Sequence, residues 1–147
     1  MAWRVLAMAA LAVAASGLVR GDLKQARAEA NLEKRSKLAL ENAGAMLQDA
    51  REAYQKGDNN RVEADVAEMR ESVDLAYQSL VATNKDPRRS PRWFKYAEIQ
   101  TRDMLRRLDS FEQNMSYSDR PVLADVKAFV QQVHDKLLLG LMEGKPK

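Results

Sequence analysis

Residues 90–115 read SPRWFKYAEIQTRDMLRRLDSFEQNM, and this stretch decides the fold class. Its apolar and small residues recur at alternating spacings of three and four, the period of a helix that faces other helices. They are Phe94, Ala97, Thr101, Met104, Leu108, Phe111 and Met115. Ser90 and Pro91 form a good helix start, because the hydroxyl can accept a free backbone N–H and proline needs no donor in the first turn. The stretch therefore predicts a helix over residues 91–115.

Three further stretches have the same period and predict helices at about 23–56, 60–83 and 119–141. We call the apolar stripe of each predicted helix its seam. The first helix has its seam at Leu32, Ala39, Ala43, Met46, Ala50 and Ala53, with Leu40, Leu47 and Tyr54 beside it. The second has its seam at Val62, Val66, Met69, Val73, Ala76 and Leu80. The last has its seam at Val122, Val126, Phe129, Val133 and Leu137, and Leu123, Val130 and Leu138 widen its apolar surface.

The links between these stretches are short, which favours antiparallel neighbours. Gly57 suits the left-handed residue after a helix, and Asp58, Asn59 or Asn60 can cap the next one. The sequence therefore predicts an all-α domain over residues 18–147, built as an antiparallel up-down-up-down four-helix bundle. A three-helix core with a long first helix that projects toward a dimer partner is the alternative.

Residues 50–58, AREAYQKGD, resemble the inter-helix turn of a tetratricopeptide hairpin, in which small and aromatic residues precede a Gly-Asp turn. The resemblance implies a repeat-like scaffold. It covers about a quarter of the chain, and no second copy follows at the 34-residue period of such arrays. An ordinary helical hairpin needs the same turn chemistry.

The first seventeen residues, MAWRVLAMAALAVAASG, have the pattern of an export signal. Arg4 gives the positive flank, an apolar run of eleven residues follows, and small residues end the segment. The run is shorter than the roughly 20 apolar residues of a membrane span. We therefore expect residues 1–17 to be a signal peptide and the protein to be exported, either periplasmic or secreted. Retention of the segment as an N-terminal anchor is the alternative.

Composition narrows the chemistry. The chain has one histidine, no cysteine and no glycine-rich phosphate loop, so the common catalytic and metal-binding patterns are missing. We expect no enzymatic activity, no metal and no cofactor. The net charge is only +3, but residues 85–107 hold eight basic and three acidic residues, which leaves the rest of the chain slightly acidic.

An exported, cysteine-free four-helix bundle with several methionines and one histidine in its last helix is similar to the cytochrome b562 family. That resemblance implies a haem or small-molecule carrier as the alternative function, with His134 as a candidate ligand. Antiparallel pairing of the last two predicted helices would bring Met104 near the level of His134, which makes Met104 the second candidate ligand. The family pairs its last-helix histidine with a methionine near the start of helix one, whereas the first helix here offers only Met46.

The segment with the strongest binding signal is residues 85–96, KDPRRSPRWFKY. It combines positive charge with aromatic rings at a helix start, a pattern that suits anions through bidentate and cation–π contacts. The candidate partner-binding residues are Arg88, Arg89, Arg92, Trp93, Lys95 and Tyr96. In the simpler interpretation the aromatic rings cover the bundle end and the arginines keep a loop soluble.

The predicted export decides the partner class. We expect a non-enzymatic interaction or structural module at the cell envelope, which binds an anionic envelope component or an acidic protein surface rather than nucleic acid. Peripheral contact with a membrane and homodimerisation are both compatible with this hypothesis.

Overall fold

The computed structural model describes residues 23–145, and every regular element in that range is helical. The predicted all-α class is confirmed. The predicted signal peptide, residues 1–17, lies outside the described residues. The elements are α1 (Leu23–Ala28), α2 (Leu32–Gln55), α3 (Asn59–Ala82), α4 (Arg92–Gln113), the short 3-10 helix η1 (Arg120–Leu123) and α5 (Ala124–Glu143). No helix in this part of the chain has both the length and the apolar character needed to cross a membrane.

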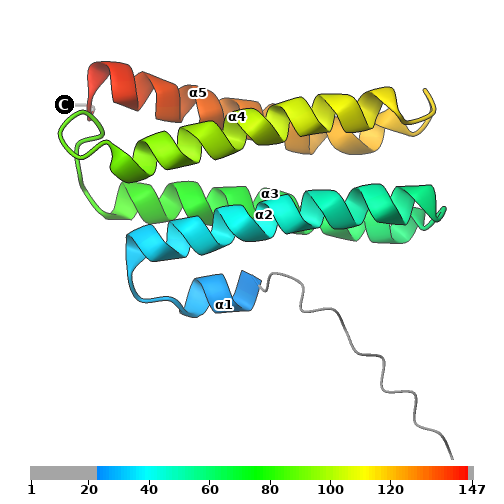
Figure 1. Cartoon of the computed structure of the whole chain (residues 1–147), viewed down its shortest axis with the longest axis horizontal. Coiled ribbons are helices and arrows are strands. Elements are labelled where there is room, and N and C mark those ends of the chain that lie inside the picture. The colour runs from blue at the N-terminus through cyan, green and yellow to red at the C-terminus, as the bar shows by residue number, and fades with distance from the viewer. Residues whose placement is uncertain (1–22, 146–147) are drawn as a thin grey trace, which may run out of the picture.

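The four long helices are arranged as two hairpins laid on one another (Figure 1). Helices α2 and α3 form one hairpin and α4 and α5 the other, while α1 lies on the outer side of the α2–α3 hairpin. In Figure 1, α2 and α4 run from left to right, and α3 and α5 run back. Each hairpin is therefore antiparallel.

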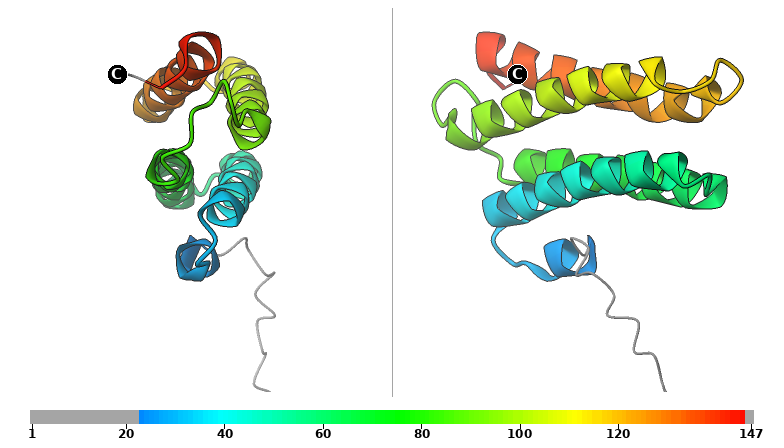
Figure 2. Two further views of the ribbon diagram at one scale, coloured as in Figure 1. Left: turned by 90° about the vertical axis from the view of Figure 1, so that its left-hand side faces the viewer. Right: turned by 45° about the vertical axis from the view of Figure 1, so that its right-hand side comes forward.

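The order of the helices around the core is set by the link between the hairpins. Helix α4 packs on α2, α5 packs on α3, and the chain crosses from α3 to the diagonally placed α4 (Figure 2). Neighbours from different hairpins are therefore parallel. A link of this length can reach either the adjacent or the diagonal position, so its length alone does not decide between them.

The single helix expected over 23–56 is wrong, because the chain breaks between α1 and α2. Asn31 caps α2 by accepting a hydrogen bond from the Lys34 amide at 2.9 Å. The Glu29 carbonyl accepts one from Arg35 Nε at 2.8 Å. These side-chain bonds replace helical backbone bonds at residues 29–31. The alternative with one long first helix is therefore also wrong.

The turn between α2 and α3 follows the sequence prediction. Gly57 has φ +74°, a conformation that costs glycine little because it has no β carbon. Asp58 caps α3 by accepting from the Arg61 amide at 3.1 Å. The start of α4 differs: Pro91 precedes the helix without a side-chain cap, and the Ser90 amide donates to the Asp86 carbonyl at 2.8 Å.

The core contains every seam residue predicted for α3 and α4. In α5 the buried face is rotated from the predicted one, since Leu123, Val126, Val130, Val133 and Leu137 are buried. Phe129 is only partly buried and lies under the guanidinium of Arg70, 4.1 Å from its ring centre. Leu138 is 40% exposed. A continuous apolar run offers several possible faces, and packing selects one of them.

Candidate functional site

The link between the hairpins, residues 83–91, is held in place by a proline. Pro87 is buried, and its ring lies against Gly140 of α5, where an added β carbon would be 3.2 Å from Pro87 Cγ. Asp86 shapes the turn, because its carboxylate accepts from the Arg88 amide at 2.8 Å and its carbonyl from the Arg89 amide at 3.1 Å. Asn84 has φ +56° at the start of the link. The link is therefore a built turn that docks on α5.

Four of the six candidate partner-binding residues come together. Arg92, Trp93, Lys95 and Tyr96 line one surface depression of about 400 Å³, with Lys37 of α2 and Ile99. We call it the α4 depression. Its cations and rings alternate, and Ile99 is 49% exposed. The depression therefore offers both positive charge and apolar surface.

The aromatic residues of the α4 depression have a fixed geometry. The Arg92 guanidinium carbon lies 4.9 Å from the Trp93 ring centre, within cation–π range. Trp93 and Tyr96 meet edge to face, with ring centres 5.9 Å apart. Both rings also pack on the core. Burial raises the pKa of Tyr96, and the nearby Glu41 carboxylate raises it further, so its hydroxyl stays neutral at physiological pH.

The two remaining candidate residues, Arg88 and Arg89, are exposed on the link and do not line the α4 depression. Arg88 turns toward the end of α5: an added β carbon on Gly144 would lie 3.2 Å from Arg88 Cδ. The six residues are therefore not one continuous surface. Four lie on α4, and the link arginines stand beside it toward α5.

A larger cleft was missed by the sequence analysis. It has a volume of about 580 Å³ and lies between the end of α3, the link, the start of α4 and the end of α5. We call it the end cleft. Its lining residues are Tyr77, Val81, Asn84, Lys85, Pro87, Phe94, Lys136, Leu137, Leu139, Gly140, Glu143, Gly144 and Lys145. One signal could have pointed to it: three consecutive leucines at 137–139 cannot all face the same core.

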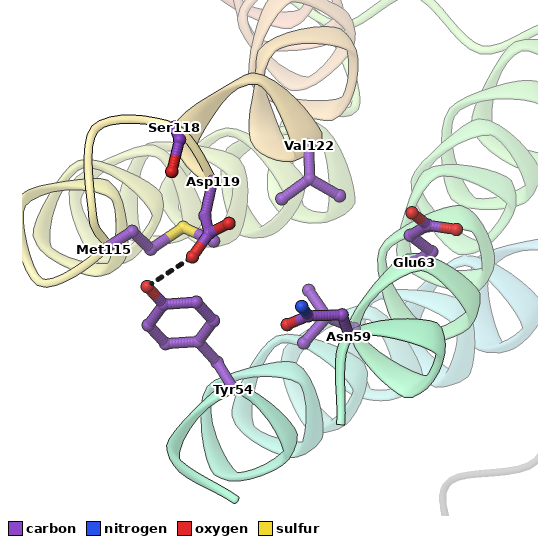
Figure 3. Close-up of a pocket in the computed structure, with 8 residues that line it drawn as sticks. Tyr54, Asn59, Glu63, Met115, Ser118, Asp119 and Val122 are labelled. Carbon is purple, nitrogen blue, oxygen red and sulfur yellow. Dashed lines mark hydrogen bonds between the residues drawn. The ribbon is translucent and has the colours of Figure 1, made fainter. Parts of the chain in front are cut away.

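At the opposite end of the hairpins a smaller pocket, of about 280 Å³, is lined largely by polar side chains (Figure 3). The Tyr54 hydroxyl donates to Asp119 Oδ2 at 3.0 Å and accepts from the Ser116 amide at 2.9 Å. Ser116 Oγ donates to the same carboxylate oxygen at 2.7 Å. The Ser116 hydroxyl, and after it the Tyr54 hydroxyl, lowers the pKa of Asp119. We call this network the tyrosine clamp. It connects the end of α2 to the segment between α4 and η1.

The residues proposed as haem ligands are engaged in other contacts. His134 Nε2 lies 3.1 Å from Glu98 Oε1, and Nδ1 is 3.6 Å from Asp135 Oδ1, which is beyond hydrogen-bond range. Met104 is 2% exposed within the core. A haem iron at Nε2 would have to displace the Glu98 carboxylate. Among residues 23–145 no group of three or more His, Cys, Asp or Glu side chains is placed to hold a metal ion.

No family model, curated protein or solved structure gave a match to this chain. The α4 depression and the end cleft both lie at the end of the molecule where the chain crosses from α3 to α4 (Figure 1).

Proposed function

We propose that this protein is a non-enzymatic helical-bundle module of up-down-up-down topology, exported to the periplasm or beyond, that binds an anionic component of the cell envelope. An acidic protein surface has the same recognition chemistry. The contact surface is the α4 depression with the link arginines beside it. The single observation that carries the proposal is the grouping of Arg92, Trp93, Lys95 and Tyr96 around one depression with an exposed isoleucine.

The chemistry of the α4 depression suits the interface of an anionic lipid layer. Trp93 and Tyr96 present amphipathic rings, which favour the boundary between water and apolar chains. Arg92 and Lys95 supply the positive charge that attracts acidic head groups. Ile99 adds apolar area that is costly to leave in water.

The turn at the link supports the same surface. Because Pro87 docks on Gly140, the exposed Arg88 and Arg89 project from a fixed backbone rather than from a loose loop. Less conformational entropy is then lost when these side chains meet a partner. Basic residues concentrated at one end of a nearly neutral protein also orient its approach to a negative surface.

Vesicle binding tests this proposal. The full chain should co-sediment with vesicles that contain phosphatidylglycerol but not with vesicles of phosphatidylcholine alone. Binding should weaken as sodium chloride rises from 0.05 to 0.5 M, roughly, because salt screens exposed charges. The combined substitution of Arg88, Arg89 and Arg92 by Ser should abolish co-sedimentation.

The matched control removes three positive charges elsewhere. Arg51, Lys56 and Arg106 are each replaced by Ser, and this variant should bind nearly as well as the original chain. Equal losses for the two variants would mean that only net charge matters, and salt-independent binding by both would reject the proposal. Mass spectrometry of the chain recovered from its own compartment tests export, since removal of residues 1–17 is expected.

A further inference from the structure

The end cleft has an apolar interior and an exposed apolar rim. Phe94 and Leu137 are 7% and 2% exposed, and Pro87 is buried, so they form its base. Val81 and Leu139 are 48% and 53% exposed, so they form its rim. A concave apolar surface of this size is typical of a ligand site, because its hydration is unfavourable until something covers it.

The exposed apolar surface continues beyond the cleft along α5. Leu138 is 40% exposed and Met142 is 68% exposed, one and five residues after the cleft residue Leu137. Of the six exposed large apolar residues in the described range, four lie at or beside the end cleft: Val81, Leu138, Leu139 and Met142. This concentration favours a contact site over ordinary surface.

Positive charge surrounds this apolar cleft. Three lysines and one glutamate line it: Lys85, Lys136, Lys145 and Glu143. Lys85 pairs with Glu33, and the Lys145 ammonium donates to the Asn84 carbonyl at 3.4 Å. The Lys136 ammonium lies 5.6 Å from the Tyr77 ring centre. Within the described range neither Lys136 nor Lys145 is ion-paired with a carboxylate, so an anion would not have to displace a carboxylate from either ammonium group.

We propose that the end cleft binds the anion of a long-chain fatty acid. The alkyl chain lies along Val81, Phe94 and Leu137, where it replaces water on apolar side chains. The carboxylate meets the ammonium groups of Lys136 and Lys145 through charge-assisted hydrogen bonds. A cleft that combines apolar side chains with the ammonium groups of Lys136 and Lys145 favours this ligand over a neutral lipid or a small polar anion.

The test measures binding of dodecanoate to the full chain by isothermal titration calorimetry, below the concentration at which dodecanoate forms micelles. One site per chain is expected. From octanoate through decanoate to dodecanoate, affinity should rise by up to about fourfold per added methylene. A series whose affinity does not change with chain length would overturn the proposal.

Two variants test the contacts of the alkyl chain and those of the carboxylate separately. Leu139→Glu introduces charge on the rim at a position that is already exposed, and it should weaken dodecanoate binding at least tenfold. Combined K136Q and K145Q should weaken dodecanoate binding about five- to tenfold while binding of neutral dodecanol is unchanged. The matched controls are Ile99→Glu, which alters an exposed apolar residue elsewhere, and K34Q with K56Q; both should bind as the original chain does.

Other occupants of the end cleft predict different results. If residues 1–17 or a second copy of the chain filled it, dodecanoate would not bind the full chain, or Leu139→Glu would change the oligomeric state without affecting dodecanoate. Either result overturns the proposal. Combined R92S and K95S should leave dodecanoate binding intact even where vesicle binding is lost, so this inference and the proposed envelope contact can fail separately.

Discussion

The two ends of the hairpins differ in how the polar side chains there are paired. At one end the tyrosine clamp satisfies its polar groups within the protein, through Tyr54, Ser116 and Asp119. At the other, Pro87 docks on Gly140 and leaves an apolar cleft whose rim lysines, Lys136 and Lys145, are without carboxylate partners among the described residues. The comparison indicates that the polar groups of the tyrosine clamp serve the fold, whereas Lys136 and Lys145 are the groups that we propose meet a ligand.

The largest effect is expected from removing an aromatic ring at each end. Phe111 is 2% exposed and contacts Tyr54 edge to face, with ring centres 5.9 Å apart. Phe111→Ala should cost about 3–5 kcal/mol of unfolding free energy, because the cavity it leaves is enclosed. Phe94→Ala should cost less, about 3 kcal/mol or below, because it enlarges a cleft that is already open. Urea unfolding of both variants measures the difference, and equal losses would contradict this view of the two ends.

A second prediction concerns the packing of the core between the two ends. Ala43 is fully buried in α2, a helix that also buries Ala39, Ala50 and Ala53. Ala43→Leu should destabilise the fold by about 1–3 kcal/mol through overpacking. The exposed Ala128 of α5 provides the control, since Ala128→Leu should stay within about 0.5 kcal/mol. An unchanged urea midpoint for Ala43→Leu would count against close packing around the alanine face of α2.

The third prediction breaks the tyrosine clamp without leaving a cavity. Tyr54→Phe removes the hydroxyl that accepts from the Ser116 amide, and a loss of about 1 kcal/mol in unfolding free energy is expected. Tyr77→Phe is the counterpart at the end cleft. Its ring faces the Lys136 ammonium, so stability should change little when the hydroxyl is removed. Comparable losses for the two variants would remove the distinction between the ends.

The fourth prediction uses pH. The pKa of Asp119 is lowered in the folded state, chiefly by the Ser116 hydroxyl and then by the Tyr54 hydroxyl. Stability from this carboxylate is therefore present above the unfolded pKa of about 3.9 and is lost as pH falls through the lower folded value. The original chain should lose more unfolding free energy between pH 6 and pH 2, roughly, than Asp119→Asn does. Parallel pH profiles would contradict the clamp's role.

The smallest effect is expected at the rim of the end cleft. Replacing Lys136 and Lys145 together by Gln should change the unfolding free energy by no more than about 0.5 kcal/mol, since both are exposed. Thermal unfolding without ligand measures this. A larger loss would mean that these lysines support the fold, as the polar groups of the tyrosine clamp do.

The sequence predicted the helices better than their arrangement. The seams of α3 and α4 are buried as expected, because a heptad pattern with one apolar side leaves a helix a single favourable face. The apolar residues of α5 surround more of the helix, so the pattern did not decide that Phe129 and Leu138 turn outward. The break before α2 depends on hydrogen bonds made by the side chains of Asn31 and Arg35, which have no periodic signal in the sequence.

The candidate site was predictable only in part. Residues 85–96 stood out because charge and aromatic rings adjoin in sequence, and four of the residues chosen there line one depression. The end cleft could not be found in the same way. Its walls come from α3, the link, the start of α4 and the end of α5, which the chain crossing between α3 and α4 brings together.

That diagonal crossing also has a consequence for how the chain folds. The most extensive helix contacts are within α2–α3 and within α4–α5, between segments that follow one another directly in sequence. Most of the native structure is therefore reached by closing short loops, which is the condition for rapid folding. Each hairpin can collapse before the other is complete. The end cleft has walls from α3 in one hairpin and from α5 in the other, so it is expected to be among the last features to form.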